Sequence, residues 1–88
     1  LHDALPISMA QEFAGAGDAA KAVEFFDRCI AADPRHAYAH YHKAKVLDDA
    51  GDRVAAIAAI NKGLQAAKAG GDSKAAGELT ALLDELSD

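Results

Sequence analysis

Residues 10–26 read AQEFAGAGDAAKAVEFF, and residues 44–60, at an offset of 34, read AKVLDDAGDRVAAIAAI. In this register Gly17-Asp18 falls on Gly51-Asp52. Further pairs are Ala10 and Ala44, Phe13 and Leu47, Ala16 and Ala50, Ala22 and Ala56, Val23 and Ile57, Phe26 and Ile60, and Ile30 and Leu64. A shift of one residue destroys the match. A period of this length predicts that the chain is built from repeated structural units.

Each copy predicts an α-helical hairpin. Apolar residues recur with helical spacing before and after each Gly-Asp pair. The glycine can take the left-handed conformation that ends one helix, and the aspartate can cap the next helix. Asp33-Pro34 predicts the end of the first hairpin, and the third helix is expected to begin near Ala37.

The end of the chain predicts a fifth helix. No proline follows the second copy, so its last helix is expected to run on, and to be longer than its counterpart, until Gly70-Gly71. Asp72 or Ser73 then caps a helix that reaches about Leu86. Its apolar residues share one side: Ala75, Ala76, Leu79, Leu82, Leu83 and Leu86. Such a helix can close a stack of hairpins, because it covers the last one and shows water its polar side.

Composition limits the classes of function. The chain has 88 residues, enough for one small domain, and 51% of them are apolar, mostly alanine, which favours packed helices. The net charge is −5 and the basic residues are scattered singly, which argues against nucleic acid as a partner. No apolar run could span a membrane and no signal peptide begins the chain, so we expect a cytoplasmic protein.

The first eight residues stand apart from the repeat. LHDALPIS, residues 1–8, resembles the translation of a sequencing adapter. We therefore expect residues 1–8 to be an adapter-derived scar or a disordered extension. Their one structural role would be to extend the first helix backwards from Pro6.

The histidines raise the question of a metal site. His36 and His40 have the i, i+4 spacing that lets two imidazoles reach one metal ion. His42 points about 160° away from His40 on a helix, so it cannot supply a third ligand. We assign no metal site and keep binding by the histidine cluster as a remote alternative; the favoured arrangement is a semi-buried His40 beside two solvated histidines.

No arrangement for catalysis is evident. Cys29 lies on or beside an apolar stripe, where a buried, inert thiol is expected. Asp48 and Asp49 are consecutive and project in different directions on a helix. We assign no catalytic residue and no cofactor, and we expect a protein that is not an enzyme.

The repeat resembles the tetratricopeptide repeat family. The first unit matches its pattern at Ala10, Phe13, Gly17, Asp18, Ala22, Phe26 and Pro34, and the second at Ala44, Leu47, Gly51, Asp52, Ala56, Ile60 and Leu64. The second unit departs at Lys68, where the closing proline would fall, and at His40 and Lys43, where large apolar side chains are usual. The resemblance implies an all-α, right-handed solenoid, with units at residues 9–36 and 37–70 and a capping helix at 71–88.

The resemblance also implies a peptide-binding surface. In this family the first helix of each hairpin lines the concave face, where peptides bind. Helical spacing places Tyr38, Tyr41, His42, Lys45 and Asp49 on one stripe, opposite the core-facing His40, Ala44 and Leu47, with both tyrosines exposed. We predict a peptide site made of those five residues, with Gln11 and Arg35 beside them.

Two functions stay open. The favoured one is a non-catalytic interaction module that binds a protein or peptide through the concave face. In the alternative the chain is the C-terminal end of a longer solenoid, with upstream repeats, or a homo-oligomer. The tyrosines then belong to internal packing or to a self-association surface.

Overall fold

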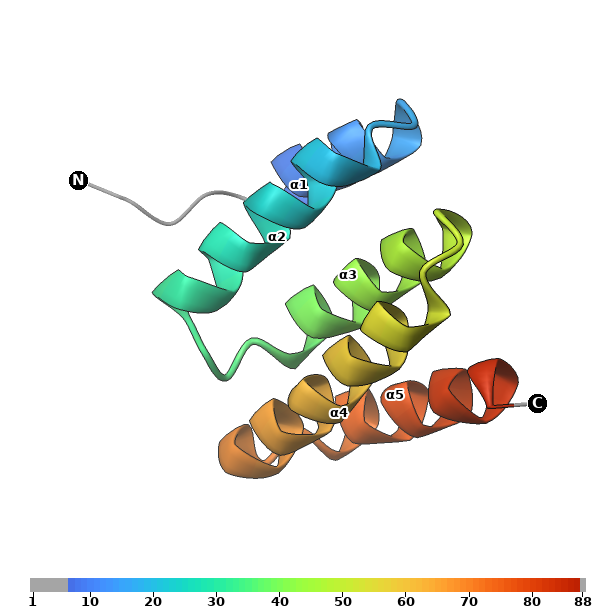
Figure 1. Cartoon of the computed structure of the whole chain (residues 1–88). Coiled ribbons are helices and arrows are strands. Elements are labelled where there is room, and N and C mark those ends of the chain that lie inside the picture. The colour runs from blue at the N-terminus through green and yellow to red at the C-terminus, as the bar shows by residue number, and fades with distance from the viewer. Residues whose placement is uncertain (1–6, 88) are drawn as a thin grey trace.

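The structure, a computed structural model, describes residues 7–87, which form five helices and no strand. The helices are α1 (Ile7–Gly15), α2 (Ala19–Ala32), α3 (Ala37–Asp49), α4 (Arg53–Gly70) and α5 (Ser73–Leu86). The pairs α1–α2 and α3–α4 form two consecutive hairpins, and α5 packs against the second of them (Figure 1). The expected all-α class and helical repeat arrangement are confirmed.

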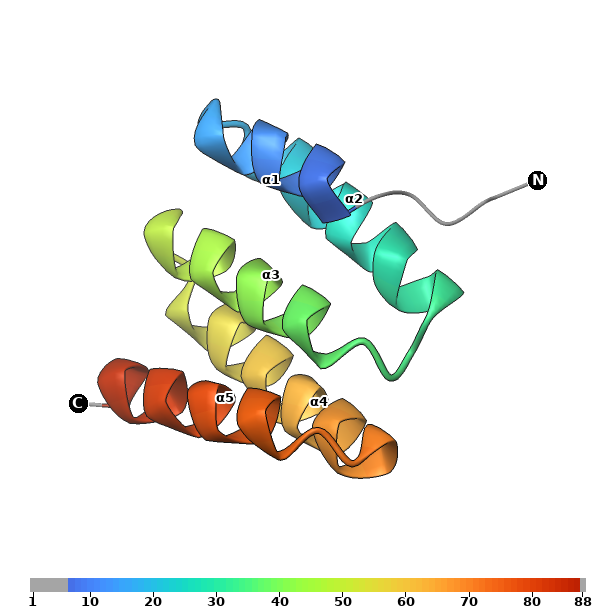
Figure 2. The ribbon, with the colours of Figure 1, turned by 180° about the vertical axis from the view of Figure 1, so that it is seen from behind.

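The helices form two layers. Helices α1, α3 and α5 lie side by side on one face (Figure 2), and α2 and α4 lie on the other face (Figure 1). Helix α3 contacts α4 extensively but approaches α1 at few positions. The face formed by α1, α3 and α5 is therefore the one on which the first helices of both hairpins are exposed.

The same Gly-Asp turn occurs three times within residues 7–87. Gly17, Gly51 and Gly71 have φ angles of 82°, 88° and 68°, in the left-handed region that favours glycine. The aspartate after each glycine caps the next helix: Asp18, Asp52 and Asp72 accept hydrogen bonds from the backbone N–H groups of Lys21, Ala55 and Ala75. These contacts explain why helices begin at residues 19, 53 and 73. Helix α4 has 18 residues and α2 has 14, which confirms that the fourth helix is the longer one.

The apolar core consists of two clusters. The smaller cluster belongs to the first hairpin and contains Ala10, Ala22 and Phe26. The larger one joins α3, α4 and α5 and includes the fully buried Ile60 and Leu79. The two clusters share no buried residue, although Val46 of α3 packs against the smaller one. The predicted apolar side of α5 is confirmed, because its residues either belong to the larger cluster or pack against it.

Gly63 marks the closest approach of α4 to its neighbours. A Cβ atom added to Gly63 would lie 2.8 Å from Cβ of His40 on α3 and 3.1 Å from both δ-methyl carbons of Leu79 on α5. Because real Cβ atoms do not come so close to a neighbouring Cβ, only glycine fits at this position.

Helix α1 begins directly after Pro6. Ile7 is half-buried against the smaller cluster, so Ile7 and Ser8 belong to the folded domain. The remaining residues of the proposed scar, 1–6, lie outside the described part of the chain. Within residues 7–87, no helix is long and apolar enough to cross a membrane.

Candidate functional site

A groove of about 330 Å³ lies between α1 and α3. Its lining consists of Gln11, Ala14, Gly15, Phe26, His42, Lys45, Val46 and Asp49. Four of the seven residues predicted for the peptide site, Gln11, His42, Lys45 and Asp49, are in this list. Its lining residues come mainly from α1 and α3, the first helices of the two hairpins, which lie side by side (Figure 2).

His42 joins the walls of the groove. Gln11 Nε2 on α1 lies 3.4 Å from Nε2 of His42 on α3, so the amide can donate a hydrogen bond to the neutral imidazole. The His42 ring stacks on Phe26 of α2, with ring centroids 6.1 Å apart. The prediction of a solvated His42 is wrong, because these contacts leave the ring only partly exposed.

Lys45 and Asp49 carry the charges of the groove. Both side chains are exposed and lie one helical turn apart on α3, and neither makes an ion pair within residues 7–87. Lys45 Nζ lies 5.7 Å from the centroid of the Tyr41 ring, a weak cation–π distance. Both charges are thus available to a ligand.

The two tyrosines are less exposed than predicted. Both are partly buried and pack against the larger apolar cluster, with their rings edge to face. The Tyr38 hydroxyl donates a hydrogen bond of 3.0 Å to Oε2 of Glu78 on α5. Burial and this hydrogen bond raise the pKa of Tyr38. The prediction of two exposed tyrosines is wrong because α5 covers this part of α3, and Tyr38 serves to connect the two helices.

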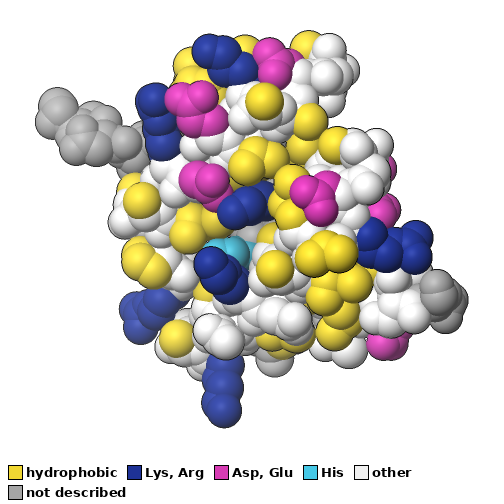
Figure 3. Space-filling model, viewed as in Figure 1, with side chains coloured by type: hydrophobic (Ala, Val, Ile, Leu, Met, Phe, Trp, Pro, Cys, Tyr) yellow, Lys and Arg dark blue, Asp and Glu magenta, His cyan; other side chains and the backbone are white. Residues whose placement is uncertain are grey.

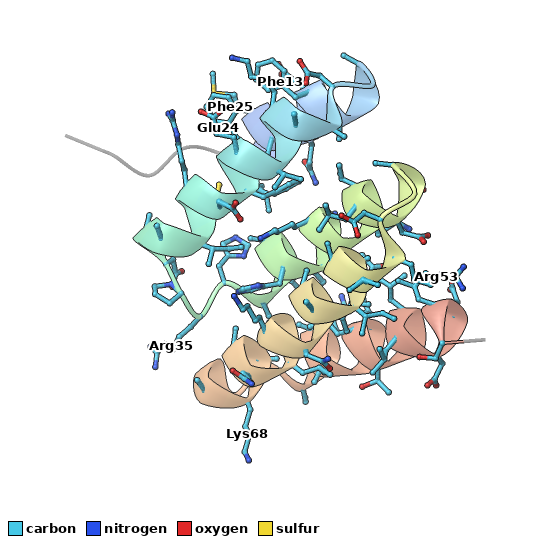
Figure 4. The ribbon with its side chains drawn as sticks, viewed as in Figure 1. Phe13, Glu24, Phe25, Arg35, Arg53 and Lys68 are labelled. Atoms are coloured by element: carbon cyan, nitrogen blue, oxygen red, sulfur yellow. The ribbon has the colours of Figure 1, made fainter. Side chains whose placement is uncertain are left out.

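Arg35 does not join the groove. It lies in the turn between α2 and α3, and a Cβ atom on Gly70 would be 3.7 Å from Arg35 Cβ. Figure 4 shows its side chain on the outside of the molecule, on the same side as Lys68. The groove lies at the other end of α3, towards Asp49. The structure therefore does not support grouping Arg35 with the other predicted residues.

Small residues extend the groove towards the hairpin turns. A second hollow, of about 190 Å³, adjoins the first and shares Ala14, Val46 and Asp49 with it. Gly17, Ala19 and Ala50 complete its lining. Sequence reasoning missed this apolar floor. The alanines and glycines of residues 14–20 could have indicated it, because small side chains leave space between helices.

His36 and His40 serve the structure. His40 packs at the crossing of α3 and α4 as expected, but at 6% exposure it is buried rather than semi-buried. His36 is half-buried rather than solvated, and its Nδ1 accepts a hydrogen bond from the N–H of Ala39 at the start of α3. No group of three His, Cys, Asp or Glu side chains within the described residues could hold a metal ion. Cys29 is also buried, and burial raises the pKa of its thiol.

The two histidines of α3 predict a pH-dependent stability. Burial lowers the pKa of His40, with Lys43 and Lys62 adding to the effect, and Asp27 opposes it. Burial also lowers the pKa of His42, with Lys45 adding and Glu78 opposing; His36 lowers both pKa values. Because the unfolded chain binds protons more readily near pH 6.5, stability should be complete above that pH and should fall as the pH drops through the two folded-state pKa values.

Thermal unfolding between about pH 5.5 and pH 7.5 tests this expectation, since carboxylates are mostly ionised in that range. The melting temperature of the wild type should be lower at the acidic end. The double variant His40→Gln/His42→Gln should lose most of this dependence, whatever its absolute stability. Equal melting temperatures of the wild type at both pH values would contradict the assignment, as would an unchanged pH dependence in the double variant.

Comparison with known proteins supports the fold. A family model described as tetratricopeptide repeat matches residues 13–83. A TPR repeat-containing protein of Pseudomonas aeruginosa is 33% identical over 82 residues, which make up 93% of this chain and 78% of that protein.

Two solved structures share the arrangement of helices. The solution NMR structure of a tetratricopeptide repeat domain protein from Salinibacter ruber has a TM-score of 0.83 at 24% identity, over 91% of this chain and 81% of that chain. A crystal structure of a tetratricopeptide repeat domain protein from the same organism has a TM-score of 0.80 at 23% identity, over 92% and 90% of the two chains. Both confirm the helical repeat fold that the sequence predicted.

Proposed function

Because this chain belongs to the tetratricopeptide repeat family, we propose that it binds an extended peptide segment of a partner protein in the groove between α1 and α3. The fold indicates a protein-interaction module, and members of the family are generally non-catalytic. We further propose that the ligand is a peptide, that it binds in this groove, and that this chain is not an enzyme. Neither nucleic acid nor membrane is proposed as a partner, and the cytoplasmic location stays a prediction.

The observation that carries the proposal is the combination of an apolar floor with two charged side chains, Lys45 and Asp49, that form no ion pair within residues 7–87. Ala14 and Val46 offer apolar contact at the bottom of the groove. Lys45 and Asp49 stand at its wall without ion pairs inside the described chain. An extended peptide exposes both backbone N–H and C=O groups, so Lys45 can donate a hydrogen bond to a peptide C=O and Asp49 can accept one from a peptide N–H.

The hollow beside the groove gives the peptide an anchor. Apart from Asp49, its lining consists of alanines, Gly17 and Val46, and it is continuous with the groove through Ala14, Val46 and Asp49. One aliphatic side chain of the peptide would fill this hollow while the backbone follows the groove. Binding sites commonly combine such an apolar pocket with a few well-placed polar groups.

The two tyrosines have different roles in this proposal: Tyr38 packs against α5, and Tyr41 contacts the peptide. The contact of Tyr38 with Glu78 supports the earlier alternative that this tyrosine belongs to internal packing. Tyr41 lies one turn further along α3, next to His42 at 5.4 Å between ring centroids and below Lys45. We therefore propose Tyr41 as the aromatic edge of the peptide site and leave Tyr38 out of it.

Selection from a library of displayed random peptides of about 12 residues, followed by calorimetric titration, tests the site. The Lys45→Ala variant should bind the selected peptides at least about fivefold more weakly than the wild type, because it loses one charged contact at the groove wall. Lys68→Ala, a lysine of α4 outside the groove, should bind like the wild type. Because Lys45 and Lys68 are both exposed, neither change should alter the fold.

Amide chemical shifts of the isotope-labelled protein locate the peptide independently. The changes in chemical shift on adding peptide should concentrate on α1 and on the second half of α3, around Gln11, His42 and Asp49. Changes confined to α2 and α4 would contradict the proposal. Equal affinities of the Lys45→Ala and Lys68→Ala variants would also contradict it.

A further inference from the structure

The first hairpin has an apolar surface on the side away from the second hairpin. The rings of Phe13 and Phe25 stack there, with centroids 5.2 Å apart, and both remain partly exposed. Figure 4 shows them side by side at the edge of the hairpin, and Figure 3 shows apolar atoms mixed with charged ones at this edge. Met9, which is 40% exposed, lies on the same side of α1 as Phe13. We call Met9, Phe13 and Phe25 the end surface.

The repeat shows what the corresponding surface does in the second hairpin. The offset of 34 relates Met9 to Lys43, Glu12 to Val46, Phe13 to Leu47 and Phe25 to Ala59. Lys43 forms an ion pair of 2.6 Å with Asp27 of α2, and Val46 packs against the core cluster of the first hairpin. Leu47 and Ala59 line a groove together with Val23 of α2. The counterpart of the end surface is thus the interface by which the second hairpin packs on the first.

The charges around the end surface suit a second copy of the same surface. Lys21 and Arg28 of α2 lie over the faces of Phe13 and Phe25, at 6.0 Å and 5.0 Å from the ring centroids. Glu12, on the other helix of the hairpin, α1, provides an exposed carboxylate. It makes no ion pair within the described residues. If two copies meet about a two-fold axis with α1 of one against α2 of the other, Glu12 of each lies near Lys21 and Arg28 of its partner.

The P. aeruginosa relative lacks room for an additional hairpin, and the charges around the end surface favour a second copy as its partner. Its 82 matched residues are 78% of its length, so too few residues remain outside the match for another 34-residue unit. We propose that two copies of this chain associate through the end surface, with Phe13 and Phe25 at the centre of a two-fold symmetric contact. This dimer would leave the α1–α3 groove open, and it does not depend on peptide binding.

Sedimentation velocity or light scattering after size exclusion, over about 5 to 500 µM protein, tests the proposal. The wild type should shift from monomer towards dimer as its concentration rises. Phe25→Glu should remain monomeric, because it would bury a carboxylate in the centre of the contact. Val54→Glu makes the same kind of change at an apolar residue that is 82% exposed on α4, and it should dimerise like the wild type.

Arg28→Glu, at the edge of the end surface, is a second test of the dimer in case Phe25→Glu disturbs folding. The Arg28 side chain is 55% exposed and forms an ion pair of 2.8 Å with Glu24, which is 50% exposed. Because losing such an exposed ion pair costs little, Arg28→Glu should keep the helical circular dichroism of the wild type. It should raise the dimer dissociation constant at least about tenfold, because it places a like charge opposite Glu12 of the partner. A wild type that stays monomeric at the highest concentration overturns the proposal and leaves the surface to a hairpin of another chain. A dimer that is unchanged in Phe25→Glu or Arg28→Glu also overturns it.

Discussion

Replacing Gly63 by alanine is expected to lower the free energy of unfolding by about 1–3 kcal/mol. The usual effect of this change inside a helix is the opposite, since alanine restricts the unfolded chain and favours the helix. At Gly63 the added methyl group would lie 2.8 Å from Cβ of His40. That atom is attached directly to the backbone of α3, so α3 and α4 must move apart to relieve the contact. The packing loss should outweigh the gain in helix propensity.

Gly77→Ala is the matched control. Gly77 lies inside α5, is exposed, and has no atom within 4 Å of the position of an added Cβ. Here alanine should raise the free energy of unfolding by about 0.4–1 kcal/mol. Urea denaturation followed by circular dichroism compares both variants with the wild type. If both changes stabilise the protein, the prediction for Gly63 is wrong, and α3 and α4 can move apart at Gly63 with little loss of packing.

The hairpins could be predicted from sequence because their determinants are local. A glycine that adopts positive φ and an aspartate that caps the next helix act within a few residues, and the offset of 34 made the signal at Gly17-Asp18 visible twice. The beginning of α5 followed from the same device at Gly71-Asp72. Burial of Phe26 and Ile60 followed from the apolar stripes.

The candidate site could be predicted only in part. Helical spacing shows which residues share a face of a helix, but not which other helix packs against that face. Three residues of the predicted stripe of α3, His42, Lys45 and Asp49, line the groove. The stripe was wrong about the exposure of Tyr38, because Glu78 lies 40 positions away in the sequence and belongs to another helix. Arg35 was grouped with these residues although it lies at the other end of α3 from the groove.

Contacts between helices decide the rest. The sequence contains no local sign that Gly63 faces His40 and Leu79, or that Phe13 stacks on Phe25. Both depend on how two helices cross, which is set by the side chains of both. For the same reason the small residues that form the floor of the groove became meaningful only when α1 and α3 were placed side by side.

Phe26→Ala should have the largest effect on stability, a loss of about 3–5 kcal/mol. Phe26 is completely buried and is the one large side chain among the three buried residues of the smaller cluster, whose other members are Ala10 and Ala22. Phe25→Ala is the control: it removes the same ring from the neighbouring position of the same helix, where the ring is partly exposed. It should cost clearly less. Both are compared by urea denaturation at a few µM protein, so that self-association does not contribute.

The effect of Phe26→Ala should be largest in the first hairpin, because the larger cluster of α3, α4 and α5 shares no buried residue with the cluster of Phe26. Ile60 and Leu79 remain packed among α3, α4 and α5 when Phe26 is lost. Hydrogen exchange should therefore show α1 and α2 exchanging quickly while amides of α4 and α5 stay protected. Equal loss of protection in all five helices would contradict this expectation, as would a Phe25→Ala variant as unstable as Phe26→Ala.

The same variant connects stability with the proposed function. The Phe26 ring lies under His42 and belongs to the floor of the groove, and Gln11 on α1 forms the opposite wall. If α1 and α2 unfold while α4 and α5 persist, only the α3 side of the peptide site remains. Phe26→Ala should then abolish peptide binding, whereas Phe25→Ala should retain it, because the Phe25 ring lies on the end surface and not in the groove. Full peptide affinity in a Phe26→Ala protein with an unfolded first hairpin would place the peptide on α3 to α5 instead.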